Sequence, residues 1–278
     1  MPRARPGVLI VVGGPQYRVG SHRQFTQLAR ALAAGGHAVL RFDCRGMGDS
    51  SGTFPGFENI GPDIRAAMDT FARELPGISS VVIFGLCDAA SAALLYCASD
   101  ARVAGLILAN PWVRSVAGEA KSYVKHYYGR RLLQGSFWGK LLTGRLQVAA
   151  SLADLLRKVA HARQGRDVHQ GATSVSFIDR MLRGLASFQG RVLFLLSERD
   201  LTAQEFRDLC RASGDWSALI RRPGVAVRAC AGADHTFSSA AARDAATAAA
   251  LDWLQGDGVT AQSSTENASA IAGGGRLS

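Results

Sequence analysis

The sequence contains no apolar stretch long enough to cross a membrane, since no window approaches the roughly 20 apolar residues that a spanning helix needs. The first apolar run, residues 8–12, is also too short for the core of a signal peptide. The five cysteines are odd in number and show no paired spacing, which argues against a disulfide framework and for a reducing compartment. We therefore expect a cytoplasmic protein without a transmembrane segment.

Acidic residues are scarce relative to basic ones, and the formal net charge is +10. Because the sequence has neither zinc-ligand clusters nor an aromatic and basic strand signature, we expect no nucleic-acid partner, no metal and no cofactor. The positive charge is concentrated in residues 114–183, where thirteen basic residues face four acidic ones. This distribution favours an anionic substrate, although a solvated basic surface or a peripheral membrane contact explains it equally well.

Segments typical of strands and of helices alternate along most of the chain. Helical periodicity is expected at residues 22–34, 57–75 and 88–98, from 203 onward, and at 239–254. Apolar runs predict strands at residues 8–12, 38–43, 81–86, 103–109, 192–196 and 225–230. The alternation is typical of a mostly parallel sheet flanked by helices on both faces.

The alternation stops after Ala109, and about 75 residues follow with helical periodicity and no clear strand. We expect residues 1–111 and 188–255 to form one α/β core, and residues 112–187 to form a helical cap inserted into it. Residues 256–278 are rich in Gly, Ser, Thr and Ala, so they are expected to be a disordered tail.

The segment 81–90, Val-Val-Ile-Phe-Gly-Leu-Cys-Asp-Ala-Ala, carries the pattern of a nucleophile elbow. In that pattern the central residue lies on a sharp turn between a strand and a helix, and the residues two before and two after it must be small. Cys87 is the central residue, and Gly85 and Ala89 flank it. Because a helix N-terminus stabilises a thiolate, we predict that Cys87 is the nucleophile; the alternative is a small buried cysteine. The other cysteines lack this context and are expected to be structural: Cys44, Cys97, Cys210 and Cys230.

In sites built on such an elbow, the acid and then the base follow the nucleophile along the chain. His235 lies in a glycine-containing loop after the predicted strand 225–230, which is the place of the general base; an exposed loop histidine is the alternative. Asp200 follows the predicted strand 192–196 and is the expected acid that orients the imidazole, with Glu198 as the second candidate.

Two N–H groups are expected to bind the oxygen of a substrate carbonyl. One belongs to Asp88, directly after the nucleophile. The second should come from the loop after the first strand, Gly13-Gly14-Pro15-Gln16. Since proline has no N–H, Gly14 and Gln16 are the candidates, and a plain tight turn is the alternative.

Three motifs together resemble a known family: residues 13–25 (Gly-Gly-Pro-Gln-Tyr-Arg-Val-Gly-Ser-His-Arg-Gln-Phe), 41–50 (Arg-Phe-Asp-Cys-Arg-Gly-Met-Gly-Asp-Ser) and 85–96 (Gly-Leu-Cys-Asp-Ala-Ala-Ser-Ala-Ala-Leu-Leu-Tyr). Over about residues 8–255 the chain resembles the exosortase A system-associated hydrolases of type 1, in the serine-aminopeptidase-like branch of the α/β-hydrolase superfamily. The resemblance implies an α/β-hydrolase fold and a bacterial enzyme linked to exopolysaccharide production and protein sorting. It supports Cys87, Asp200 and His235 by motif match.

Proteins of this kind usually carry an antiparallel strand pair before the first parallel strand, whereas this chain begins almost at that strand. An unprotected edge strand is an aggregation hazard, so we expect a misplaced start.

The leading hypothesis is a hydrolase that cleaves an ester or thioester through a Cys-His-Asp triad and an S-acyl enzyme. The substrate is expected to be a small molecule or acyl group, such as an anionic saccharide ester or an acyl carrier. An acyltransferase with the same intermediate and a non-catalytic interaction protein are the alternatives. The sequence leaves the oligomeric state open.

Overall fold

The computed structural model describes residues 5–14, 16–114, 175–256 and 264–272. Its six strands form one sheet in the order β2-β1-β3-β4-β5-β6, and every neighbouring pair is parallel. The strands are β1 (Gly7–Val11), β2 (Val39–Arg41), β3 (Val81–Leu86), β4 (Val103–Ala109), β5 (Arg191–Ser197) and β6 (Val225–Cys230). The predicted parallel sheet is confirmed.

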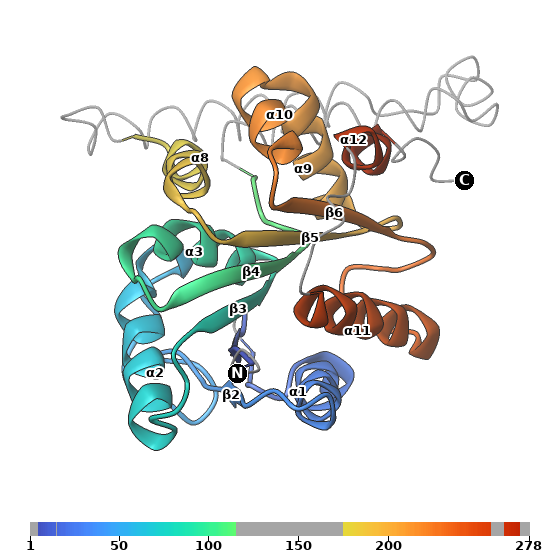
Figure 1. Cartoon of the computed structure of the whole chain (residues 1–278). Coiled ribbons are helices and arrows are strands. Elements are labelled where there is room, and N and C mark those ends of the chain that lie inside the picture. Colours follow the sequence, from blue (N-terminus) through green and yellow to red (C-terminus); the bar gives the residue numbers. More distant parts are fainter. Residues whose placement is uncertain (1–4, 15, 115–174, 257–263, 273–278) are drawn as a thin grey trace, which may run out of the picture. The chain divides into compact units, whose positions relative to one another are not determined.

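Helices cover both faces of the sheet, as the alternating pattern predicts. Helices α1 and α11 lie against one face, and α2, α3 and α8 lie against the other, while α9, α10 and α12 lie beside β5 and β6 (Figure 1). The helices are α1 (Gln24–Ala34), α2 (Gly61–Glu74), α3 (Asp88–Tyr96), α8 (Phe177–Ser187), α9 (Leu201–Ala212), α10 (Gly214–Arg221), α11 (Ala240–Gln255) and α12 (Ser264–Ala272). No helix in the described ranges is long and apolar enough to span a bilayer.

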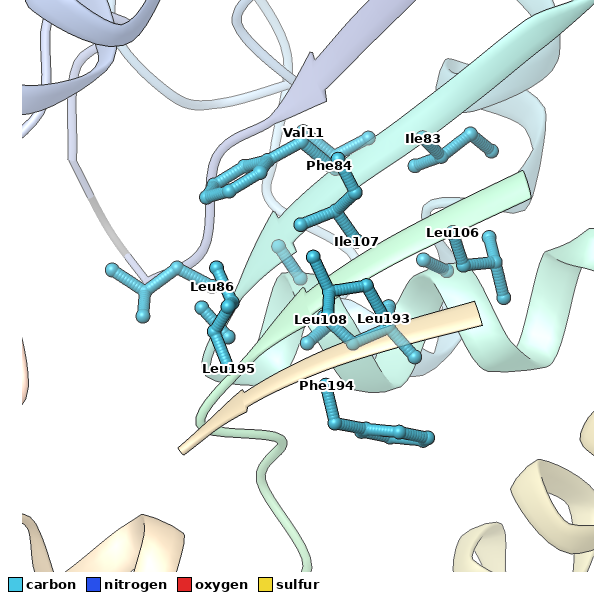
Figure 2. Close-up of a cluster of buried hydrophobic side chains, with 14 of the residues drawn as sticks. Val11, Ile83, Phe84, Leu86, Leu106, Ile107, Leu108, Leu193, Phe194 and Leu195 are labelled. Carbon is cyan, nitrogen blue, oxygen red and sulfur yellow. The ribbon is translucent and has the colours of Figure 1, made fainter. Parts of the chain in front are cut away.

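The core is formed by apolar side chains that point alternately to the two faces of the sheet. Figure 2 shows these side chains on β1, β3, β4 and β5, all of them buried. Phe194 stacks on Phe206 of α9 with ring centroids 5.1 Å apart. The central strands have no polar face because helices bury both sides, which explains their continuous apolar runs.

Strand boundaries follow the apolar runs closely, and helix boundaries follow capping residues. β3, β4 and β6 begin and end at the predicted residues. The sequence predicts one helix from residue 203, whereas the structure has α9 and α10. Ser213 separates them with an extended backbone, and its hydroxyl accepts a hydrogen bond from the N–H of Trp216 at 3.4 Å. Serine favours such N-cap positions over helix interiors, which accounts for the division.

The predicted cap, residues 112–187, falls mostly on residues 115–174, which lie outside the described part of the chain. Its last part is described and forms α8, which packs against α3. A β-carbon at Gly184 of α8 would lie 2.0 Å from the carbonyl oxygen of Leu94, so only glycine permits this approach. The assignment of residues 112–187 to a cap stays a prediction.

The prediction of a disordered tail at residues 256–278 is wrong for residues 264–272, which form α12. Asn267 of α12 is buried and bonds to backbone near and within β6: its Oδ1 accepts from Val227 N at 2.9 Å, and its Nδ2 donates to Ile220 O at 2.9 Å and to Val225 O at 2.8 Å. Ile271 is also buried. The buried side chain that anchors α12 is the polar amide of Asn267. Apolar periodicity in the sequence therefore does not predict this helix.

We expect Asn267→Ala to lower the free energy of unfolding by about 2–3 kcal/mol, because it leaves buried backbone groups without partners. Ser269→Ala, on the exposed side of α12, should change it by less than about 0.5 kcal/mol. Urea denaturation of both variants measures the difference. Equal stability of the two variants would contradict the packing of α12 against β6.

Candidate active site

Cys87 lies on the turn between β3 and α3 with φ 62° and ψ −124°, a backbone conformation that residues with a β-carbon rarely adopt. Hydrogen bonds hold the turn on both sides. The Cys87 N–H donates to Ala109 O of β4 at 2.9 Å, and the Cys87 carbonyl accepts from Trp112 N at 3.2 Å and from Ala90 N at 3.1 Å. The side chain of Cys87 is therefore fixed at the carboxyl edge of the sheet.

The two small flanking residues are required by close packing. A β-carbon at Gly85 would lie 2.7 Å from the backbone of Ala89 and Ala90, which is closer than β-carbons pack. Ala89 is fully buried. The sharp turn that the sequence predicts is present, and α3 directs its N-terminus toward Cys87.

The structure brings His235 and Asp200 to Cys87, although the loops that carry them are far apart in the chain. His235 Nδ1 lies 3.0 Å from Asp200 Oδ2, and His235 lines the same cavity as Cys87. The hydrogen bond to Asp200, followed by the interaction with the Cys87 side chain, raises the pKa of His235 to about 10. Chemically, the three side chains form a connected series of carboxylate, imidazole and thiol.

Asp200 is held in place at the N-terminus of α9. Its carboxylate accepts hydrogen bonds from Thr202 N at 3.2 Å and Ala203 N at 3.1 Å, and its side chain is 6% exposed. The second candidate, Glu198, accepts a hydrogen bond from Gly232 N at 2.8 Å instead and braces the loop that precedes His235. The geometry favours Asp200 over Glu198 as the partner of the imidazole.

The two backbone donors predicted in the loop after β1 already have hydrogen-bond partners. Gly14 N donates to Asp88 Oδ1 at 2.8 Å and Oδ2 at 3.1 Å, and Gln16 N donates to Gly14 O at 2.8 Å. Neither N–H is therefore free in this structure, and the role of Gly14 or Gln16 as an oxyanion donor stays a prediction. The carboxylate fits because Gly13 has no side chain: a β-carbon there would lie 2.1 Å from Asp88 Oδ1.

A cavity of about 310 Å³ opens over the Cys87 thiol. Its walls combine apolar side chains with a few polar groups, as is usual for small-molecule sites. The lining residues are Gly13, Gly14, Gln16, Phe57, Leu86, Cys87, Asp88, Trp112, His235 and Thr236. The cavity therefore contains Cys87, His235, Asp88 and the loop after β1.

Sequence reasoning missed Asn110, which joins the two loops behind the site. Asn110 has φ 45° and is fully buried. Its Oδ1 accepts from Ser197 N at 2.8 Å, and its Nδ2 donates to Ser197 Oγ at 3.0 Å and to the His235 carbonyl at 3.2 Å. Asparagine tolerates the left-handed backbone better than most residues, which is the only local signal for this position.

The other four cysteines are buried away from this cavity. Burial raises the pKa of the thiols of Cys44, Cys97 and Cys210 to about 12 and that of Cys230 to about 11. They therefore stay protonated at neutral pH, and Cys87 is only partly buried. Within the described ranges, no group of three or more His, Cys, Asp or Glu residues could hold a metal ion.

Comparison with known proteins identifies the family. The model of the family described as "Serine aminopeptidase, S33" matches residues 7–203. No curated protein matches the chain significantly.

Solved structures share the fold at low identity. An esterase of Pyrococcus furiosus is 14% identical with a TM-score of 0.58 and covers 91% of this chain and 83% of its own. The Est1E protein of Butyrivibrio proteoclasticus, solved with ferulic acid, is 15% identical with a TM-score of 0.54 and 91% coverage of both chains. A monoacylglycerol lipase of Paleococcus ferrophilus is 18% identical with a TM-score of 0.54, covering 90% of this chain and 96% of its own. The predicted α/β-hydrolase fold is confirmed.

We expect Asn110→Ala to destabilise the protein by about 1–3 kcal/mol and to slow alkylation of Cys87, because it releases the His235 loop and leaves Ser197 N unpaired. Asn59→Ala, at an exposed asparagine, is the matched control. Urea denaturation measures the stability, and the rate of reaction with iodoacetamide reports on the Cys87–His235 pair. Wild-type values for both in Asn110→Ala would show that the amide does not hold the site.

Proposed function

The chain belongs to the serine aminopeptidase S33 family of α/β hydrolases, and from this premise we propose that it hydrolyses an ester or thioester with Cys87 as nucleophile. The observation that carries the proposal is the connected series Cys87–His235–Asp200 beneath a cavity that can admit an acyl group. The description of the family names a serine aminopeptidase, whereas the central residue of the elbow in this chain is a cysteine, Cys87.

The proposed nucleophile is the thiolate of Cys87 paired with the imidazolium of His235. Because the pKa of His235 is raised to about 10, the ring carries a proton at neutral pH. A protonated ring cannot deprotonate a neutral alcohol, but it stabilises a thiolate beside it. The N-terminus of α3 adds partial positive charge at the same place.

In the proposed reaction, the Cys87 thiolate attacks the acyl carbon, an S–C bond forms, and the carbonyl electron pair moves to oxygen. The tetrahedral intermediate collapses, the bond to the leaving alcohol or thiol breaks, and His235 donates its proton to that group. A water molecule then attacks the S-acyl enzyme, and His235 takes its proton as the carboxylic acid leaves. Asp200 keeps the ring oriented throughout.

The finer identity of the substrate is proposed from the sequence. The concentration of basic residues in 114–183 favours an anionic acyl compound, such as an acidic saccharide ester or an acyl carrier. The resemblance to exosortase-associated hydrolases favours a role in exopolysaccharide systems. The cytoplasmic location inferred from the cysteines also stays a prediction.

We expect iodoacetamide to alkylate Cys87 in preference to the four buried cysteines, and His235→Ala to slow this reaction at neutral pH. The direction of the pH effect follows from the raised pKa of His235. The imidazolium persists below about pH 10 and is lost as the pH rises through that value. The alkylation rates of the wild type and His235→Ala should therefore differ most at neutral and acidic pH, and the difference should shrink as the pH approaches 10. Peptide mass spectrometry across pH 5–10 measures this difference.

The control for this experiment is His22→Ala, which removes an exposed histidine. Hydrolysis of p-nitrophenyl acetate gives a second readout, and Cys87→Ala should abolish it. Hydrolysis by Cys87→Ala at the wild-type rate, or identical alkylation profiles with and without His235, would remove the thiol mechanism.

A separate test addresses the anionic substrate. Reversing the charge of Arg130, Arg131 and Lys140 should raise KM for anionic esters and leave KM for neutral esters unchanged. Only anionic esters would lose an electrostatic attraction to these side chains. Paired ester panels of equal acyl length measure this. Equal effects on both classes would show that the basic segment does not select substrate.

A further inference from the structure

We propose that Arg207, a buried arginine of α9, is a positioning residue for Asp200, the acid of the proposed mechanism. This inference rests on the proposed function, because Asp200 acts there by orienting the imidazole of His235. The carboxylate of Asp200 is fixed to the start of α9 by hydrogen bonds from Thr202 N and Ala203 N. Its position relative to the sheet therefore depends on how α9 is held.

Arg207 fastens α9 to the end of β5. Its Nη2 donates to Leu196 O at 3.0 Å, and its Nη1 donates to Ser197 O at 3.2 Å. These carbonyls belong to the last two residues of β5, and Asp200 lies three residues beyond them. Arg207 follows Asp200 by about two helical turns. The chain thus leaves β5, forms the turn that carries Asp200, and is bonded back to β5 through this one side chain.

The N–H groups of the same turn are held by other parts of the site. Ser197 N donates to Asn110 Oδ1 at 2.8 Å, and Glu198 N donates to Cys230 O of β6 at 3.1 Å. Arg207 binds the carbonyl groups that these bonds leave aside. The turn before Asp200 is therefore fixed from both sides, and Arg207 provides one of them.

The bonds of Arg207 require a buried guanidinium. The side chain is 1% exposed, and its Nε donates to Ala270 O in the last turn of α12 at 3.3 Å. Burial lowers the pKa of this group, and nearby acidic groups, Asp200 among them, act in the opposite direction. Arginine presents its donors in a rigid fork, whereas lysine has a single ammonium group. One arginine can therefore bind β5 and α12 at the same time.

A displaced Asp200 should be detectable at His235. The hydrogen bond to Asp200 is the largest cause of the raised pKa of His235. The other titratable groups that face the ring are Cys87 and Asp88, and replacement of Arg207 leaves both in place. Loosening of the Asp200 turn should therefore lower the pKa of His235 from about 10 toward its ordinary value.

The test compares Arg207→Met with Arg207→Lys in the full chain, with p-nitrophenyl acetate as substrate. Methionine keeps an aliphatic side chain and removes every donor, so kcat should fall by about 10–100-fold with less than about a twofold change in KM. Lysine keeps a charged donor, so kcat should stay within about fivefold of the wild-type value.

Nuclear magnetic resonance titration of the His235 ring, assigned with His235→Ala, gives a readout that a purely structural role would not change. The pKa of His235 should be lower by about 1 or more in Arg207→Met and should be intermediate in Arg207→Lys. Met68→Ala controls for a general loss of stability, since this residue is buried in α2, which carries no residue of the described site. It should lower the urea midpoint and keep the wild-type kcat and the wild-type pKa of His235.

Wild-type kcat in Arg207→Met would overturn the proposal. A loss of kcat with an unchanged pKa of His235 would also contradict it, because Asp200 would then not be displaced. If Arg207→Met does not fold, Arg207→Lys decides the question, and an unchanged pKa of His235 in that variant rejects the proposal. Failure of the proposed function is recognised separately, since Cys87→Ala would then still hydrolyse the ester.

Discussion

The strained turn at Cys87 is the constraint on which the rest of the site depends. A residue with a β-carbon is unfavourable at φ 62° and ψ −124°, and it persists only where the surroundings hold it. Here β4 binds the Cys87 N–H, Trp112 binds its carbonyl, and Gly85 lets α3 approach the strand. The buried strands and the alanines of α3 thus stabilise a conformation that the local chain would not adopt. This conformation exposes the Cys87 thiol at the edge of the sheet, next to the N-terminus of α3.

The parallel sheet then determines which distant residues meet this thiol. All six strands run in one direction, so the loops after β1, β3, β4, β5 and β6 emerge at one edge. Gly14, Cys87, Asn110, Asp200 and His235 come from these five loops in that order. Asn110 connects the last two of them, because one amide bonds both to Ser197 near the acid and to the His235 carbonyl. The 3.0 Å contact between His235 and Asp200 is therefore a property of the sheet register and of this amide.

Most of the fold could be read from the sequence, because apolar runs report buried strands and a nucleophile elbow is a local steric pattern. β3, β4 and β6 were predictable to the residue, as was the turn at Cys87. The sequence does not predict which polar side chains are buried against partners far away in the chain. Asn267 is buried because it bonds to backbone near and within β6, and Asp88 reaches Gly14 only because residue 13 lacks a side chain. Apolar periodicity carries no information about such amides and carboxylates, so α12 and the engaged oxyanion loop were missed.

The charges around the elbow favour a thiol over a hydroxyl as the proposed nucleophile. A serine would need a neutral imidazole to take its proton, whereas Asp200, the largest cause of the raised pKa of His235, favours the protonated ring. A thiol can ionise beside such an imidazolium, and the pair is then neutral overall. In the proposed mechanism the cysteine and the raised pKa of His235 therefore depend on each other, because Cys87 is itself one of the groups that raise that pKa.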